Sequence, residues 1–308
     1  MHSKSPSNVD IESRLVIPRA EIRGKGAFIL TGPSSCGKGE LSQALCDALS
    51  IPQERWLSMG NILRHSFEHA KEWPEFAQTL QTKYGISDAT PILECEDATD
   101  ELVAKVASHQ EALEGFLKGR RNEPHPDGDW RSTSQLEWLE YCTINGLLVP
   151  NRWTQALIEA HIELFAHEVD QPFIVDGYPR TKAAAAHLLE VFKRHGIPVI
   201  KVLHLSISKQ QMLRRAGKRQ RMDDNNQALL KRYEFYVESV QPSVDYLKDQ
   251  VGSEKVALID AHQPHYDMVG EEKVFNLARS INNVVYASLI SIGLSNVLAR
   301  SLVASRQA

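Results

Sequence analysis

One short segment, residues 32–40 with the sequence GPSSCGKGE, constrains the fold of this 308-residue chain more than any other. It follows a short apolar run at 27–30 and precedes a stretch with helical spacing at 41–49. A strand, a glycine-bounded loop and a helix in this order aim backbone amides at one point, where the helix N-terminus adds positive charge. The segment therefore predicts a polyphosphate site, with Lys38 reaching the terminal phosphates, although the strict pattern has Ser or Thr where this chain has Gly39.

Short apolar runs alternate with helix-length segments along most of the chain. We expect strands at 27–30, 173–175, 199–205 and 256–259, with a weaker candidate at 55–57. Helical segments lie between or after them at 40–49, 153–167, 182–195 and 226–247. This alternation predicts an α/β fold with a doubly wound parallel sheet, in which ligands bind at the carboxyl ends of the strands. The phosphate loop and Asp176 both fall at such ends.

Composition excludes several classes of function. The formal charge of −4 gives no overall attraction to nucleic acid or to an anionic membrane, and no apolar run approaches the length of a membrane span. Residues 1–25 form a polar tail without the apolar centre of a signal peptide. The four cysteines show no paired metal spacing, which is typical of a reduced, cytoplasmic protein. Cys36, inside the loop, is expected to be a small space-filling residue.

Four stretches that carry chemistry follow one another in a specific order. They are the phosphate loop, LSMGNILR at 57–64, FIVDGYPRT at 173–181, and RQRMDDN at 219–225 with KRY at 231–233. Together they resemble the adenylate kinase and UMP/CMP kinase family of nucleoside monophosphate kinases, over residues 26–64 and 144–262. The resemblance implies a P-loop kinase that transfers the γ-phosphoryl group of ATP, with Mg²⁺, to a small-molecule phosphate acceptor, most simply a nucleotide.

The resemblance also implies roles for individual residues. Catalytic roles fall to Lys38, Asp176, Arg221 and Arg232, with Asp176 orienting the magnesium ion through water. Binding of ATP falls to Gly32, Ser34, Ser35, Cys36, Gly37, Lys38, Gly39, Glu40, Arg215 and Arg219. Binding of the acceptor falls to Gly60, Asn61, Arg64, Gly177, Arg180, Ala184 and Asp223. A planar guanidinium suits bidentate phosphate binding, which is the role expected of Arg64 and Arg180.

The chain departs from the family pattern at several of these positions. Ser35 stands at the second loop glycine, Glu40 at the threonine after GKG, and Asn61 at the aspartate of the TGD motif. Ala184 falls where the family has an amide that reads the acceptor base, and alanine cannot make that contact. Two alternatives stay open: a kinase of another small metabolite on the same scaffold, or a degenerate nucleotide-binding module with a regulatory or interaction role.

The resemblance divides the chain into parts. The P-loop kinase core comprises 26–64 and 144–265, with a short lid at about 214–222. Residues 65–143 form a helical insertion on the acceptor side, in which Asp97 or Thr99 is expected to cap a helix. Residues 266–308 are expected to be helical, with one pattern at 271–307 interrupted at Gly293. We expect this helix to pack on the sheet and to extend towards a partner subunit in a homo-oligomer; its few Lys and Arg residues disfavour a membrane anchor.

Overall fold

The structure is a computed structural model that describes residues 17–119, 129–147, 149–166, 170–219 and 226–306. Within these residues, five strands form a parallel sheet in the order β2-β3-β1-β4-β5. Their bounds are β1 Gly26–Thr31, β2 Trp56–Ser58, β3 Pro172–Asp176, β4 Val199–Ser206 and β5 Val256–Asp260. The central strands are buried on both faces, which explains why they read as continuous apolar runs in the sequence.

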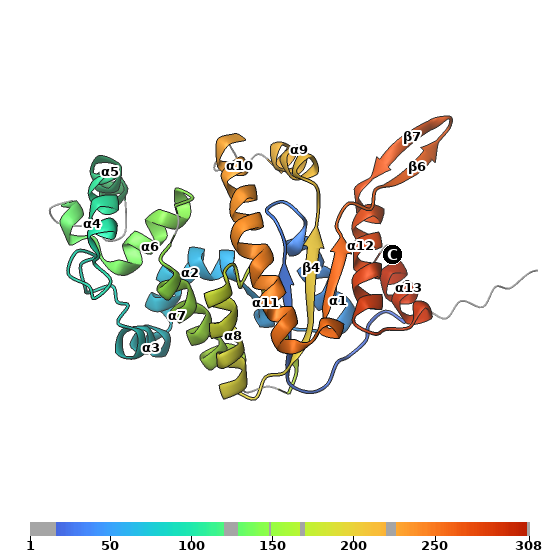
Figure 1. Ribbon diagram of the computed structural model, residues 1–308, viewed down its shortest axis with the longest axis horizontal. Helices are drawn as coiled ribbons and strands as arrows, with labels where there is room; N and C mark the ends of the chain where they lie inside the picture. Colours follow the sequence, from blue (N-terminus) through green and yellow to red (C-terminus); the bar gives the residue numbers. More distant parts are fainter. Residues whose placement is uncertain (1–16, 120–128, 148, 167–169, 220–225, 307–308) are drawn as a thin grey trace, which may run out of the picture.

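Helices cover both faces of this sheet. Successive side chains of β1 point to opposite faces, so that Phe28 and Leu30 join one core cluster while Ala27 and Ile29 join the other. The helices on the Phe28 face are α1 Lys38–Leu49, α9 Lys209–Arg219, α12 Leu277–Ser291 and α13 Asn296–Ser305. Those on the opposite face include α7 Asn151–His161, α8 Lys182–Arg194 and α11 Gln241–Val251 (Figure 1). The doubly wound P-loop kinase architecture predicted from the sequence is confirmed.

Shorter helical turns connect these elements. The 3₁₀ helices are η1 Gln53–Arg55, η2 Trp130–Ser132 and η5 Ser253–Lys255. Two π-helical turns, η3 Ile162–Ala166 and η4 Tyr236–Val240, continue α7 and α10 respectively, where α10 spans Asn226–Phe235. Because η4 leads directly into α11, one long helical rod runs from Asn226 to Val251.

The described part of the acceptor-side segment is helical. Its helices are α2 Met59–Glu72, α3 Pro74–Tyr84, α4 Asp100–Ala107, α5 Gln110–Gly119 and α6 Gln135–Ile144. Their buried side chains belong to the same core cluster as one face of the sheet, so the segment extends the core sideways. Thr99 caps α4, whereas Asp97 accepts a hydrogen bond from the Trp153 indole at 2.7 Å and pairs with Arg152. Of the two expected caps, only Thr99 is correct.

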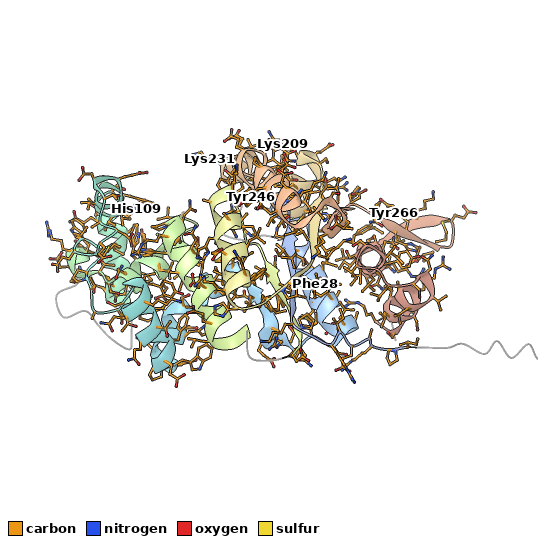
Figure 2. The ribbon with its side chains drawn as sticks, turned by 60° about the horizontal axis from the view of Figure 1, so that its bottom comes forward. Phe28, His109, Lys209, Lys231, Tyr246 and Tyr266 are labelled. Atoms are coloured by element: carbon orange, nitrogen blue, oxygen red, sulfur yellow. The ribbon has the colours of Figure 1, made fainter. Side chains whose placement is uncertain are left out.

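The expectation of helix throughout 266–308 is wrong at its beginning. Strands β6 His265–Val269 and β7 Glu272–Asn276 form an antiparallel hairpin that turns at Gly270, whose φ of 64° suits glycine. Tyr266 and Phe275 lie opposite each other in this hairpin, with ring centroids 5.8 Å apart. Helix begins only at Leu277. Figure 2 shows Tyr266 and His109 of the insertion at opposite ends of the molecule.

The end of the polar N-terminal tail lies against the body of the protein. The Ala20 amide donates to the Ala48 carbonyl at 2.8 Å, and the Ile17 amide donates to Ser301 Oγ at 2.5 Å. Residues 17–25 are therefore part of the folded structure. Across the residues described, no helix has both the length and the apolar character needed to cross a membrane.

Candidate active site

The phosphate loop joins β1 to α1 through a backbone that only small residues tolerate. A Cβ atom at Gly32, where φ is 142°, would lie 2.5 Å from the Leu205 carbonyl oxygen of the neighbouring strand β4. Gly37 occupies the N-cap of α1 with a φ of 96°. Ser35, which replaces a family glycine, adopts a φ of 57° and so takes the left-handed conformation that glycine would adopt without strain.

Two cations hold this loop through its carbonyl groups. Lys38 Nζ donates to the carbonyl oxygens of Gly32 at 3.0 Å and Pro33 at 2.9 Å, and lies 3.6 Å from the buried Cys36 Sγ. Arg215 of α9 donates to the Cys36 carbonyl at 3.2 Å and to the Ala261 carbonyl at 2.7 Å. Arg215 thus connects the loop, α9 and the end of β5, which places a guanidinium beside the loop as the sequence predicted.

Asp176 lies beside the loop at the carboxyl end of β3. It is buried opposite Leu30 of β1, and the Leu30 carbonyl accepts a hydrogen bond from the Gly177 amide at 3.1 Å. Burial raises the pKa of Asp176, while the positive charge of Lys38 opposes this shift and the negative charge of Glu40 adds to it. The three side chains therefore share one electrostatic environment at the edge of the sheet.

Glu40 belongs to this environment. Its Oε2 lies 3.8 Å from the place where a Cβ on Gly37 would sit, and its charge acts on Asp176. Two carboxylates thus face the loop where the family has one. Carboxylate oxygens are hard ligands, so Asp176 and Glu40 together fit a hydrated Mg²⁺ ion chemically. Of the two side chains, Asp176 is buried and Glu40 is exposed.

The two arginines predicted to bind the acceptor lie on different elements. Arg180 follows β3 and donates from Nε to the Gly177 carbonyl at 2.8 Å. Desolvation lowers the pKa of its guanidinium; Asp176 opposes that shift and Arg232 adds to it, so these three groups lie close enough to interact. Arg64 on α2 donates from Nη2 to Asn61 Oδ1 at 2.6 Å. Asn61 therefore orients Arg64 with a neutral amide in place of the family carboxylate.

Other predicted site residues divide into described and undescribed ones. Ala184 is buried in the first turn of α8, where its amide donates to Thr181 Oγ1 at 3.1 Å, and its methyl group offers no polar contact to an acceptor. Arg221 and Asp223 lie outside the described residues, and so does the side chain of Arg219. The first part of the expected lid is the end of helix α9. The lid itself stays a prediction.

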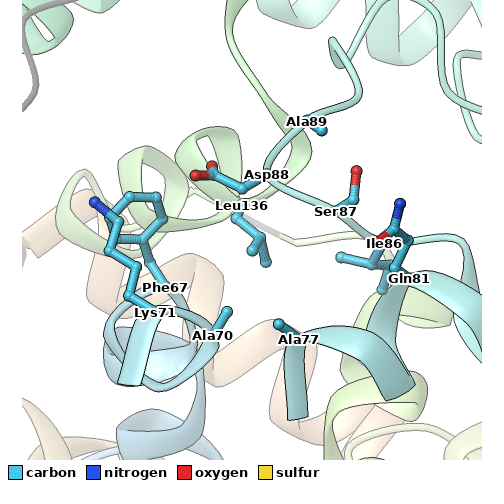
Figure 3. Close-up of a pocket in the computed structure, with 10 residues that line it drawn as sticks. All are labelled: Phe67, Ala70, Lys71, Ala77, Gln81, Ile86, Ser87, Asp88, Ala89 and Leu136. Atoms are coloured by element: carbon cyan, nitrogen blue, oxygen red, sulfur yellow. The ribbon is translucent and has the colours of Figure 1, made fainter. Parts of the chain in front are cut away.

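A cavity of about 210 Å³ lies between α2, α3, α6 and the segment 86–89, in the part of the chain predicted to face the acceptor. Figure 3 shows Phe67 and Lys71 on one side of it, with Gln81 and Ser87 on the other. Asp88, also at its margin, accepts a hydrogen bond from Ser134 Oγ at 2.7 Å. Lys71 follows Arg64 by seven residues on α2, which is about 10 Å along the helix and on the same face. Sequence reasoning did not find this cavity.

Sequence reasoning also missed a buried polar group behind the phosphate loop. Thr31 Oγ1 lies 2.7 Å from His204 Nδ1, and His204 Nε2 lies 2.9 Å from the Tyr236 hydroxyl. The signal in the sequence was a histidine between two leucines in the predicted strand 199–205. A buried polar side chain in a central strand needs partners, and that requirement could have drawn attention to it.

Comparison with known proteins agrees with this geometry. The family model described as adenylate kinase matches residues 131–251. The adenylate kinase of Mycolicibacterium smegmatis is 30% identical over 223 residues, which cover 72% of this chain and 86% of that protein. The chain belongs to the adenylate kinase family. A relative from Mycolicibacterium paratuberculosis is 25% identical over the same coverage, and one from Cyanothece is 31% identical over 41% of this chain and 65% of its own.

Among solved structures, a gluconokinase from Sinorhizobium meliloti aligns with 88% of this chain and 93% of its own, at 14% identity and a TM-score of 0.39. The family membership confirms the resemblance read from the four motifs. It makes this chain a member of a family of kinases that act on nucleotides, and its site carries the phosphate loop such kinases need.

Proposed function

We propose that this protein transfers the γ-phosphoryl group of ATP to a phosphate-bearing small molecule, with a nucleotide as the first candidate. The observation that carries the proposal is the convergence of Lys38, Asp176 and Arg180 beside the phosphate loop, at the carboxyl ends of β1 and β3. A cation, a carboxylate and a phosphate-binding guanidinium are the groups that phosphoryl transfer between two anions requires.

In the proposed reaction an oxygen of the acceptor phosphate attacks the γ-phosphorus of ATP, the bond to the β-γ bridging oxygen breaks, and ADP leaves with that electron pair. Lys38 would exchange its two carbonyl partners for oxygens of the donor phosphates. The loop amides and the N-terminus of α1 would hold the same phosphates. Magnesium, when bound, would neutralise phosphate charge, and Asp176, aided by Glu40, would hold its water shell.

Arginines would align the two substrates. Arg64 and Arg180 lie on the acceptor side and suit bidentate contacts with the acceptor phosphate. Arg232, which interacts with Arg180, would contact the phosphoryl group in flight, together with Arg221 from the lid. Arg215 and Arg219 would flank the donor nucleotide, and Gly60 and Asp223 would complete the acceptor site.

A second candidate acceptor is a phosphorylated metabolite that is not a nucleotide. Ala184 supplies no base-reading amide, and the cavity beside Lys71 and Asp88 lies about 10 Å along α2 from Arg64. An acceptor whose phosphate is held by Arg64 could place its other end in this cavity. Selective loss of acceptor affinity in Lys71→Ala, with ATP affinity unchanged, would support this candidate.

The deciding experiment measures phosphoryl transfer from Mg·ATP to AMP, CMP, UMP, GMP, dAMP and a panel of phosphorylated sugars. Turnover of any of these acceptors supports the kinase proposal and names the acceptor. Exclusive use of AMP at a kcat/KM on the order of 10⁶ M⁻¹s⁻¹ would refute the inference drawn from Ala184. Tight ATP binding without turnover of any acceptor would favour the nucleotide-binding regulatory module instead.

A further inference from the structure

A buried chain of hydrogen bonds runs behind the phosphate loop. It leads from Thr31 Oγ1 to His204 Nδ1 at 2.7 Å, from His204 Nε2 to the Tyr236 hydroxyl at 2.9 Å, and on to Gln241 Nε2 at 3.3 Å. Thr31, His204 and Tyr236 expose between 2% and 6% of their surface. The rings of His204 and Tyr236 are nearly parallel, 9° apart in orientation, with centroids at 5.8 Å. Thr31, His204 and Tyr236 come from three different elements, β1, β4 and η4.

This series of hydrogen bonds connects the phosphate loop with the helix that carries Arg232. Thr31 is the last residue of β1 and directly precedes Gly32, where the phosphate loop begins. Tyr236 opens the π-helical turn η4 that interrupts the rod formed by α10 and α11. Arg232 lies four residues earlier on α10, on the same helical face as Tyr236. A π-helical turn inside a longer helix is uncommon and often marks a functional position.

His204 is a neutral link in this chain. Burial, and then the positive charge of Lys38, lowers its pKa to about 4, while Asp245 opposes the shift. A neutral imidazole offers one donor and one acceptor, so it can donate to one hydroxyl group and accept from the other in the same arrangement. A protonated ring would donate at both nitrogens, so the hydroxyl group that donates to the neutral ring would lose its acceptor.

We propose that His204 and Tyr236 are positioning residues for phosphoryl transfer, because they hold the phosphate loop and the Arg232 helix in one fixed register. The inference rests on the proposed function and deepens it. Neither side chain touches a substrate, since both are buried behind the loop. Their effect would pass through Thr31 to the loop and through η4 to Arg232. Alignment at this level matters, because a misplacement of about 1 Å can cost on the order of 10²-fold in rate.

The test uses two variants that each delete one hydroxyl group, Tyr236→Phe and Thr31→Val, and their combination. We expect kcat to fall about tenfold in each single variant, while KM for ATP and for the acceptor stays within about twofold. The double variant should be no slower than the singles, because both break the same chain. Thr31→Ser, which keeps the hydroxyl group, should restore the rate. Tyr286→Phe is the matched control, since Tyr286 donates a 2.6 Å hydrogen bond to Asn296 outside the site.

Amide hydrogen exchange supplies a readout that does not depend on turnover. Thr31→Val should accelerate exchange in residues 236–240, although Thr31 lies in another element. All variants are compared at a temperature where circular dichroism shows them fully folded. Kinetic constants within twofold of wild type in both single variants would overturn the positioning inference. Losses of kcat that add in the double variant would overturn it too. In either case, turnover by the wild-type protein would still support the proposed kinase function. A wild-type protein that turns over no acceptor would instead refute the proposed function.

Discussion

Replacing Glu40 with glutamine should tighten the binding of ATP. The family has a threonine at this position, and Glu40 instead places a carboxylate beside the loop that is to receive three phosphates. Glu40 Oε2 lies 3.8 Å from the place where a Cβ on Gly37 would sit, so the carboxylate stands beside the N-terminus of α1. Glu40→Gln removes that charge and leaves the size of the side chain unchanged.

Coulomb's law sets the scale of the effect. Two unit charges about 6 Å apart interact with about 2.8 kcal/mol at an effective dielectric constant of 20. Glu40 is an exposed side chain, so solvent and salt screen it, and we take about 1 kcal/mol as the surviving repulsion. That energy corresponds to roughly a fivefold lower Kd for ATP.

Isothermal titration calorimetry with ATP in the presence of EDTA measures this repulsion directly. In about 0.5 M salt, the difference in Kd for ATP between Glu40→Gln and the wild type should become smaller. Glu94→Gln is the matched control, because it changes the net charge equally at an exposed position in the insertion. Weaker binding of ATP by Glu40→Gln without magnesium would refute the repulsion argument. A gain without magnesium that reverses when magnesium is added would mean that Glu40 helps to hold the ion.

Three further expectations follow from the site and the core. Lys38→Ala should lower kcat at least 10²-fold, because Lys38 Nζ, which donates to two loop carbonyls, would instead make hydrogen bonds with the phosphates that are worth about 1.5–3 kcal/mol each. A folded variant with wild-type turnover would contradict this. Arg64→Ala and Arg180→Ala should raise KM for the acceptor more than Kd for ATP. Steady-state kinetics measures the first constant and titration with ATP the second. An equal rise of both constants would show that the assignment to the acceptor is wrong. Burial lowers the pKa of His161 and of His204 to about 4, so on acidification the unfolded chain binds protons at these side chains that the folded chain does not. Between pH 7 and pH 5 the free energy of unfolding, measured with urea, should therefore fall by about 2 kcal/mol for each histidine. An unchanged free energy of unfolding over this range would contradict the prediction.

The sequence predicted the parts of the fold whose signal is local. Each strand of the main sheet is a short apolar run that ends near a turn, and the loop at residues 32–40 fixes where the first strand ends. The hairpin at 265–276 escaped prediction because its strands are mostly exposed and carry charged side chains, so they lack the apolar run that marks the strands of the main sheet. The hairpin is stabilised by cross-strand pairs on either side of the turn at Gly270, such as Tyr266 opposite Phe275. The sequence pattern of a single strand does not reveal such pairs.

The candidate site divides in the same way. The sequence motifs located Lys38, Asp176 and Arg180, and the structure brings them together because the carboxyl ends of β1 and β3 are neighbours. The link between Thr31 and His204 joins residues 173 positions apart and belongs to no motif. Only the parallel register of β1 with β4, which pairs these two residues directly, places one beside the other.

The departures from the family pattern fall on both sides of the candidate site, at Ser35 and Glu40 beside the phosphate loop and at Asn61 and Ala184 where the acceptor would bind. On the donor side, Ser35 adopts the left-handed conformation that glycine takes without strain, and Glu40 adds a carboxylate beside the loop. Lys38 and Arg215 hold the loop through carbonyl groups that any sequence would supply. On the acceptor side, Ala184 removes a side-chain contact, and the helical segment adds a cavity along α2. Backbone contacts tolerate substitution, whereas side-chain contacts with a ligand set specificity. This division favours an unchanged phosphoryl donor and an altered acceptor, so the acceptor screen is the experiment in which this chain should differ from its relatives.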